Sequence, residues 1–109
     1  MDQKPYFDSL TRKREIQKGD DTIQEEVDVI YQEVDKRIQL ITKDRILNID
    51  NSGSASLVIW NPWREKCKHT SGMHEDAYLR FVCIESANAN EDFKIIPPGC
   101  THILSATIS

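Results

Sequence analysis

Glu85 is the residue of this sequence best suited to acid–base chemistry. It ends the stretch from Tyr78 to Glu85, which is rich in β-forming residues and which we predict to be a strand. With a two-residue period, the Glu85 carboxylate shares a face with Leu79, Phe81 and Cys83. Apolar surroundings raise the pKa of a carboxyl group towards the range of a general base. The alternative is an ordinary acid at the solvated end of the strand.

Two further features are weaker candidates for a binding site. Asp28 is an acid within an apolar stretch, and a surface acid on a strand or helix is its simplest interpretation. The run Trp60-Asn61-Pro62-Trp63 brings two indole rings and an amide together at a predicted strand end. Aromatic faces beside an amide suit sugar rings, but tryptophans serve as core or rim packing as well.

The cysteines and histidines form no recognised metal-binding pattern. The three cysteines are Cys67, Cys83 and Cys100. No Cys-x-x-Cys pair is present, and no cysteine and histidine have zinc-finger spacing. His69 and His74 lie five residues apart beside Glu75, a spacing that predicts a polar loop rather than a metal site. We therefore predict no bound metal and three reduced thiols, which are typical of a cytoplasmic protein.

Length and charge exclude several classes of protein. The chain has 109 residues and a net charge of −4, from 18 acidic and 14 basic residues. Its size is that of one small domain. An acidic chain without a basic stripe is poorly suited to nucleic acid, and Arg12-Lys13-Arg14 is better interpreted as a solvated loop or strand edge. No apolar run approaches the ~20 residues of a membrane-spanning helix, and no secretory signal is visible, so we expect no membrane partner.

Residues 22–42 allow two interpretations. The apolar positions recur in steps of three and four, as in an amphipathic helix: Ile23, Val27, Ile30, Tyr31, Val34, Ile38 and Ile41. The same stretch also divides into two segments of β-forming residues, 26–32 and 36–42. Periodicity alone favours the helix.

The remainder of the sequence predicts short strands. Residues 45–50 form one strand before a turn at 51–54, and residues 57–60 form a second that is buried on both faces and ended by Asn61-Pro62. Residues 64–76 have the polar composition of a loop. After the strand at 78–85, the apolar stretch 93–96 is closed by a turn at 97–99, and 102–108 is β-like. Strands at this spacing are typical of a sandwich.

Taken together, these segments resemble the hexose-6-phosphate mutarotases, the glucose-6-phosphate 1-epimerases of the aldose 1-epimerase superfamily. Residues 58–63, VIWNPW, are similar to a V-V-W-N-P-W strand end of that family, and residues 81–85, FVCIE, to its V-C-V-E strand. Between them, residues 76–78 resemble the D-x-Y of its acidic loop. Residues 26–31 resemble its E-x-D-R-x-Y element, residues 5–8 its Y-x-D turn, and residues 98–99 its closing P-G.

The resemblance implies an all-β fold, the incomplete C-terminal part of an antiparallel, galactose mutarotase-like β-supersandwich. Residues 1–109 would be part of one such domain, and residues 26–42 would be two strands rather than a helix. By the same resemblance Glu85 is the catalytic base, and Asp28 helps to hold the sugar hydroxyls. Two positions depart from the family pattern: Val29 replaces an arginine, and Ala77 replaces an acid or glycine.

The implied reaction interconverts the α and β anomers of a hexose 6-phosphate by acid–base ring opening, without a cofactor. Members of the family are much longer, and their general-acid histidine and phosphate-binding arginines lie upstream of the matching portion. None of His69, His74 and His102 matches the acid. We therefore expect a fragment that is nearly inactive alone and self-associates through exposed strand edges. A non-catalytic carbohydrate-binding remnant and a helical interaction module are the alternatives.

Overall fold

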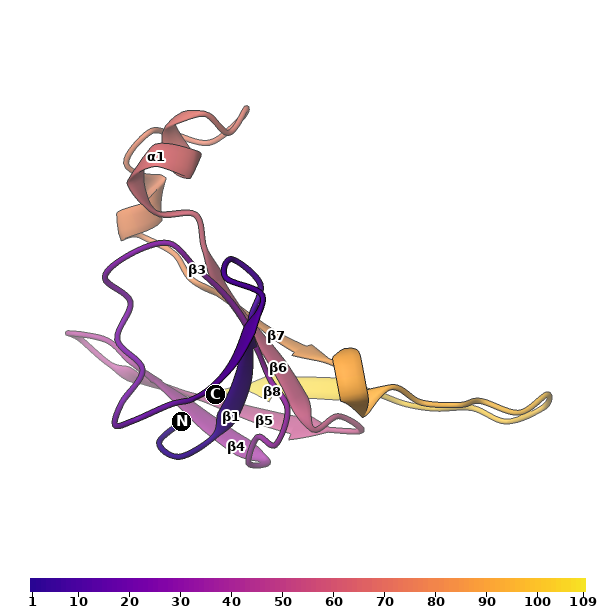
Figure 1. Cartoon of the computed structure of the whole chain (residues 1–109). Helices are drawn as coiled ribbons and strands as arrows, with labels where there is room; N and C mark the ends of the chain where they lie inside the picture. The colour runs from indigo at the N-terminus through magenta and orange to yellow at the C-terminus, as the bar shows by residue number, and fades with distance from the viewer.

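The computed structural model describes residues 1–109, and most of its regular structure is antiparallel β (Figure 1). A five-stranded sheet has the order β2-β1-β3-β6-β7, and a three-stranded sheet has the order β4-β5-β8. The strands are β1 (Pro5–Asp8), β2 (Lys13–Ile16), β3 (Val27–Tyr31), β4 (Arg37–Ile41), β5 (Ile46–Ser52), β6 (Ser56–Asn61), β7 (Cys83–Ala87) and β8 (Ser105–Ile108). The helical elements are α1 (Trp63–Lys68) and the 3₁₀ turns η1 (Ala77–Leu79) and η2 (Asn90–Asp92). The prediction of an all-β antiparallel fold is confirmed.

The five-stranded sheet has one buried face. Val29 and Tyr31 of β3 pack there against Leu57 and Ile59 of β6, and these four residues form the centre of the hydrophobic core. The alternate residues of both strands, such as Val58, point to the opposite side and are only half-buried. The prediction that residues 57–60 are buried on both faces is therefore wrong, because the sheet is covered on one side only.

Residues 22–42 contain the two strands β3 and β4, which excludes the helix that periodicity favoured. Each strand pairs along its whole length, β3 with β6 and β4 with β5. Within β3 the buried positions follow a two-residue step, Val29 and Tyr31. The apparent helical period arises because apolar residues lie on both faces of each strand, such as Val27 and Ile30 in β3 and Ile38 and Ile41 in β4. Val34, in the connection between the two strands, continues the same spacing.

The two sheets face each other across an incompletely filled space. Ile38 of β4 packs against the core cluster and Ile49 of β5 is buried, so this face of the three-stranded sheet turns inward. Beside these contacts lies an open, mainly apolar groove of about 630 Å³, lined by Leu57 and Ile84 from one sheet and by Leu40 from the other. Only 11 of the 109 residues are buried, so the core is small and the two layers are not closed over it.

The segment between β6 and β7 differs from the predicted loop and strand. Residues 63–68 are the helix α1, which begins directly after Pro62 and forms the upper end of the molecule in Figure 1. A 3₁₀ turn then occupies residues 77–79, so the strand predicted from Tyr78 starts only at Cys83 and extends to Ala87. Leu79 is therefore not in one strand with Glu85.

Residues 93–104 form an arm that projects from the body of the molecule (Figure 1). The predicted turn is present, with the Cys100 N–H donating to the Pro97 carbonyl oxygen at 3.0 Å. Its limbs have no strand structure, and most of their large apolar side chains are exposed, including Ile95 and Ile103. The apolar stretch 93–96 is thus a surface, and regular β-structure resumes only at Ser105.

β2 is the edge strand of the five-stranded sheet on the side away from β7. It contains most of the basic cluster of residues 12–14 and is exposed along its length. This agrees with the interpretation of residues 12–14 as a strand edge. The motif at residues 5–8 is the strand β1, and the turn follows it: Asp8 accepts hydrogen bonds from the N–H groups of Leu10 and Thr11, at 2.8 and 3.3 Å.

The small core makes stability sensitive to single truncations within it. Leu57→Ala removes a fully buried side chain, which costs about 2–5 kcal/mol in other cores, and we expect a large fall in the urea midpoint or loss of cooperative unfolding. Leu79→Ala, the same substitution at a side chain that is 66% exposed, is the matched control and should leave the midpoint nearly unchanged. Equal midpoints for the two variants would contradict the placement of the core.

Candidate active site

Asp28 and Glu85 lie on the same face of the five-stranded sheet. Asp28 of β3 is opposite Trp60 of β6, which is opposite Cys83 of β7. Glu85 is opposite Val58 in the neighbouring row. Directly paired residues share a face, and so do residues two positions apart along a strand. We call this side, which is opposite the core cluster, the outer face; its central residues are Asp28, Ile30, Val58, Trp60, Cys83 and Glu85.

The two acids are separated by two strand spacings across the sheet and two residues along it. This corresponds to roughly 12 Å between their Cα atoms. Trp60 occupies the strand between them, directly beside Asp28. The predicted catalytic and binding acids are therefore brought onto one surface with an aromatic side chain between their strands.

The Glu85 side chain is exposed, whereas Asp28 is half-buried. The prediction that Glu85 is partly dehydrated among apolar neighbours is wrong for this chain. The physical reason is that β7 is an edge strand, paired only with β6, and no other element covers the outer face at this point. Of the neighbours expected from the strand pattern, only Cys83 lies in the same strand.

Burial and the neighbouring acid Glu85 both change the pKa of the Cys83 thiol. Desolvation by burial raises the pKa of the Cys83 thiol, and the negative charge of Glu85 raises it further. A raised pKa keeps the sulfur protonated near neutral pH, and only the thiolate is a strong nucleophile. Cys83 is thus a neutral, half-buried neighbour of Glu85 and not a candidate nucleophile.

The two tryptophans of residues 60–63, WNPW, lie in different surroundings. Trp60 lies on the outer face and contacts Phe81, with ring centroids 5.9 Å apart. Trp63 packs against Tyr78 at 4.9 Å and lines the groove between the sheets. Only Trp60 is available to a ligand that contacts Asp28 and Glu85.

Asn61 has a structural role that its sequence position did not reveal. Its side-chain N–H₂ group donates to the carbonyl oxygens of Tyr78 and Phe81, at 3.0 and 2.8 Å. Its side-chain oxygen accepts the N–H of Trp63 at 2.8 Å. Both donors and one acceptor site are therefore used within the protein, and the buried amide is not free to bind a sugar.

The histidines lie away from the outer face of β6 and β7. His74 pairs with Asp76, whose pKa is lowered chiefly by the hydrogen bond from Arg80. His102 contacts the side chain of Asn88 at 2.9 Å, beyond the end of β7. No three or more His, Cys, Asp or Glu side chains are grouped so that they could hold a metal ion. No helix has the length and apolar character needed to cross a membrane.

Comparison with known proteins places these observations in a family. The sequence profile described as "Aldose 1-epimerase" matches residues 2–108. A Haemophilus influenzae protein named "Putative glucose-6-phosphate 1-epimerase" is 34% identical over 83 residues, which cover 74% of this chain and 30% of that protein. A Cenchrus ciliaris protein of the same name is 27% identical over 96 residues, which cover 84% of this chain and 29% of that protein.

The chain thus spans about 30% of the length of these curated relatives. The profile match extends over nearly every residue, and the antiparallel sheets that these residues form agree with the β-sandwich that the sequence motifs imply. From both lines of evidence, this chain belongs to the aldose 1-epimerase family.

Proposed function

We propose that this chain is the C-terminal part of a hexose-6-phosphate 1-epimerase and contributes its catalytic base, Glu85, and a sugar-binding carboxylate, Asp28. The observation that carries the proposal is the position of both acids on the outer face, with Trp60 on the strand between them. The family match and the printed names of two relatives support the reaction and the substrate class. The free cysteines are compatible with the reducing cytoplasm.

In the proposed reaction, Glu85 accepts the proton of the anomeric hydroxyl group of the hexose. The electrons of that O–H bond form the aldehyde carbonyl, the bond between the anomeric carbon and the ring oxygen breaks, and the ring oxygen takes up a proton from an acid. Rotation about the bond between the first two carbons and the reverse proton transfers then produce the other anomer. Proton transfer by a positioned group typically contributes ~10²–10⁴-fold to such a rate.

The arrangement of the outer face suits these roles. Glu85 is exposed and therefore accessible to a substrate, and Asp28 can accept hydrogen bonds from sugar hydroxyls. The side chain of Trp60 presents an aromatic surface beside Asp28, against which the C–H face of a sugar ring can pack.

The outer face does not supply the acid that must protonate the ring oxygen of the sugar. Apart from Asp28 and Glu85, the only titratable residue among the central residues of the outer face is Cys83, and its raised pKa makes the thiol a weak acid. The protonation of the ring oxygen therefore requires a group from outside this surface. Since an acid and a base that act together lose most of the rate when either is absent, the chain alone should be a poor catalyst.

A carbohydrate-binding surface without turnover is the second candidate. It is favoured by one observation, the half-buried Trp60 beside Asp28 on a face that nothing covers. The two candidates share a binding site and differ in whether Glu85 moves a proton, so they are distinguished by the response of anomer exchange to changes at Glu85.

Glu85→Gln removes the proposed proton acceptor with almost no change of shape. We expect the chain to accelerate the α/β exchange of glucose 6-phosphate only weakly over buffer, as measured by exchange NMR or polarimetry, and this acceleration should be lost in Glu85→Gln. Glu75→Gln changes an exposed loop acid in the same way and should have no effect. If wild type and Glu85→Gln show equal rates well above buffer, Glu85 is not the base.

Asp28→Asn tests the binding surface independently of turnover. In a titration with glucose 6-phosphate followed by amide chemical shifts, the largest changes should fall on β3, β6 and β7, and Asp28→Asn should weaken binding at least several-fold, because a carboxylate accepts stronger hydrogen bonds from hydroxyls than an amide does. Asp44→Asn, at an exposed turn, is the control. Shifts confined to the groove between the sheets would refute this location.

We also propose that the isolated chain self-associates with a second copy of itself. The sheets end in the unpaired edges of β2, β7, β4 and β8, and large apolar side chains on the projecting arm are exposed. Unpaired strand edges and exposed apolar surface both promote association. Light scattering coupled to size-exclusion chromatography should give a mass above that of one chain and rising with concentration. A concentration-independent monomer would contradict the proposal.

A further inference from the structure

The position of Glu85 depends on an edge strand with a single neighbour. In β7 the residues alternate between the outer face and the core face, and the pairing with β6 runs from Ser56–Ala87 to Trp60–Cys83. Because the side-chain period of a strand is two, a slip of β7 by one residue would turn Glu85 to the core face. An edge strand has no second neighbour to prevent that slip, so other contacts must fix its register.

At the start of β7, the contact is made by the last residue of β6. Asn61 is 2% exposed and holds the carbonyl oxygens of Tyr78 and Phe81, which lie just before the strand, through both of its side-chain N–H donors. Phe81 is four residues before Glu85. The chain that enters β7 is therefore fastened to the end of β6.

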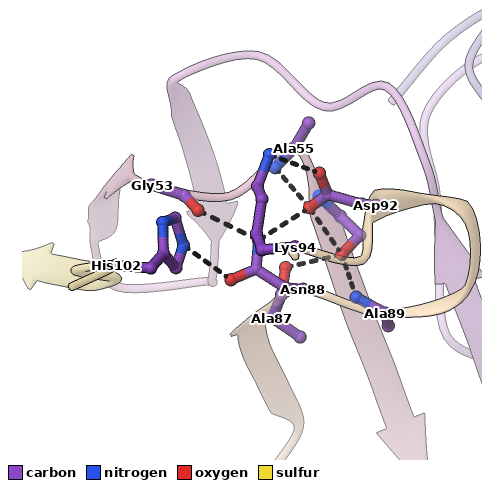
Figure 2. A network of polar contacts seen from close by, with 9 residues as sticks. Gly53, Ala55, Ala87, Asn88, Ala89, Asp92, Lys94 and His102 are labelled. Carbon is purple, nitrogen blue, oxygen red and sulfur yellow. Dashed lines mark hydrogen bonds and ion pairs between the residues drawn. The ribbon is translucent and has the colours of Figure 1, made fainter. Parts of the chain in front are cut away.

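At the end of β7, the contact is made by Ser56, the first residue of β6, with Ala87 and Ala89, both of which are labelled in Figure 2. The Ser56 hydroxyl is 2.5 Å from the Ala87 carbonyl oxygen, to which it donates, and it accepts the N–H of Ala89 at 2.9 Å. Ser56 is fully buried. Ala87 is two residues after Glu85, so β6 holds the backbone on both sides of the acid with the side chains of its own terminal residues.

Asp92 fixes Ser56 in turn, and Figure 2 shows its carboxylate at the centre of the contacts. One carboxylate oxygen accepts the N–H groups of Ala55 and Ser56, at 2.8 and 3.1 Å, and the Nδ2 group of Asn88 at 3.1 Å. The other oxygen lies 3.5 Å from the Lys94 ammonium nitrogen. Only 9% of the Asp92 side chain is exposed, so this charge is held almost entirely by protein groups.

The charge state of Asp92 agrees with this role. Desolvation by burial raises the pKa of Asp92, but the hydrogen bonds from Ala55, Asn88 and Ser56 together with the charge of Lys94 outweigh it and lower the pKa. A buried carboxylate that remains ionised needs hydrogen-bond donors, and the donors here are the first residue of β6, the residue before it and the segment after β7.

Asn88 extends the network to the neighbouring turn and to the C-terminal segment (Figure 2). Its Nδ2 group donates to the Gly53 carbonyl oxygen at 2.9 Å, and its Oδ1 atom is 2.9 Å from the ring nitrogen Nε2 of His102. Gly53 has φ +80°, and a Cβ atom there would be 1.9 Å from the Ile103 carbonyl oxygen. Glycine is therefore required for the C-terminal segment to lie against this turn.

We propose that Asp92, acting through Ser56 and Asn88, is a positioning residue that keeps β7 in register on β6 and so presents Glu85 on the outer face. The functional importance of this role rests on the proposed function of Glu85. The test below does not, because it measures the register of β7 directly. The network of Asp92 contacts the backbone at the C-terminal end of β7, at Ala87 and Ala89. Asn61 holds the N-terminal end independently.

The test uses Asp92→Asn in the full chain, with Asp20→Asn, an exposed acid, as the matched control. We expect the protected amide groups of β7 to exchange with solvent at least tenfold faster in Asp92→Asn, while those of Val29 and Tyr31 in β3 change little. The nuclear Overhauser contact between the Glu85 side chain and the methyl groups of its cross-strand partner Val58 should weaken in parallel. Ser56→Ala, which keeps the charge, should act in the same direction.

Two results would overturn the positioning role: equal acceleration of amide exchange in all strands, and unchanged exchange in β7 of both Asp92→Asn and Ser56→Ala. If Asp92→Asn does not fold, Ser56→Ala decides the question by the same measurements. Anomer exchange of glucose 6-phosphate by the wild type and Glu85→Gln is measured on the same preparations. Absence of a β7-specific change in amide exchange refutes the positioning role alone, whereas equal anomer exchange of wild type and Glu85→Gln well above the buffer rate refutes the base assignment alone.

Discussion

The register of β6 between β3 and β7 is the constraint on which both the core and the candidate site depend. The same pairing that turns Leu57 and Ile59 towards the core turns Val58 and Trp60 to the outer face. It also sets Asp28 and Glu85 on that face from the two neighbouring strands. A strand has only two faces, so when its alternate apolar residues are buried in the core, the acids between them must lie on the outer face. Stability and the proposed chemistry are thus two consequences of one register.

The incomplete closure of the sandwich explains the surroundings of Glu85. The chain spans about 30% of the length of its curated relatives, and its small core leaves an apolar groove between the sheets and an uncovered outer face. A general base gains from desolvation, and nothing in this chain supplies it at Glu85. The chain does fix the position of Glu85, because the side chains of Ser56 and Asn61 hold the two ends of β7.

Some of this was accessible from sequence because the signals were local or were carried by motifs. The turn at 97–99, the end of β6 at Asn61-Pro62 and the strand edge at residues 12–14 follow from residue type. The turn predicted at 51–54 is displaced to 53–55, because β5 continues to Ser52 through its pairing with β8. The family resemblance implies the two strands within 26–42. Periodicity alone predicts a helix there, because it does not detect the break between β3 and β4. The shared face of Asp28 and Glu85 needed the pairing partners, which sequence does not give.

The errors have tertiary causes. The strand predicted from Tyr78 begins at Cys83 because Asn61 captures the carbonyl oxygens of Tyr78 and Phe81, which a strand would have paired with a neighbour. The two tryptophans are close in sequence, yet Trp63 turns to the groove after the strand ends. The sequence around Asp92 carries no signal for its role, because a short polar stretch predicts only a turn and the partners of Asp92 lie 36 and 37 residues away.

The most direct measurement is the set of intermolecular nuclear Overhauser contacts between glucose 6-phosphate and the chain. We predict contacts from the protons of the sugar ring to the Trp60 indole and from the anomeric proton to the Glu85 side chain, with none to Trp63. Contacts to Trp63 and the apolar residues of the groove, in place of Trp60 and Glu85, would show that the outer face is not the sugar site.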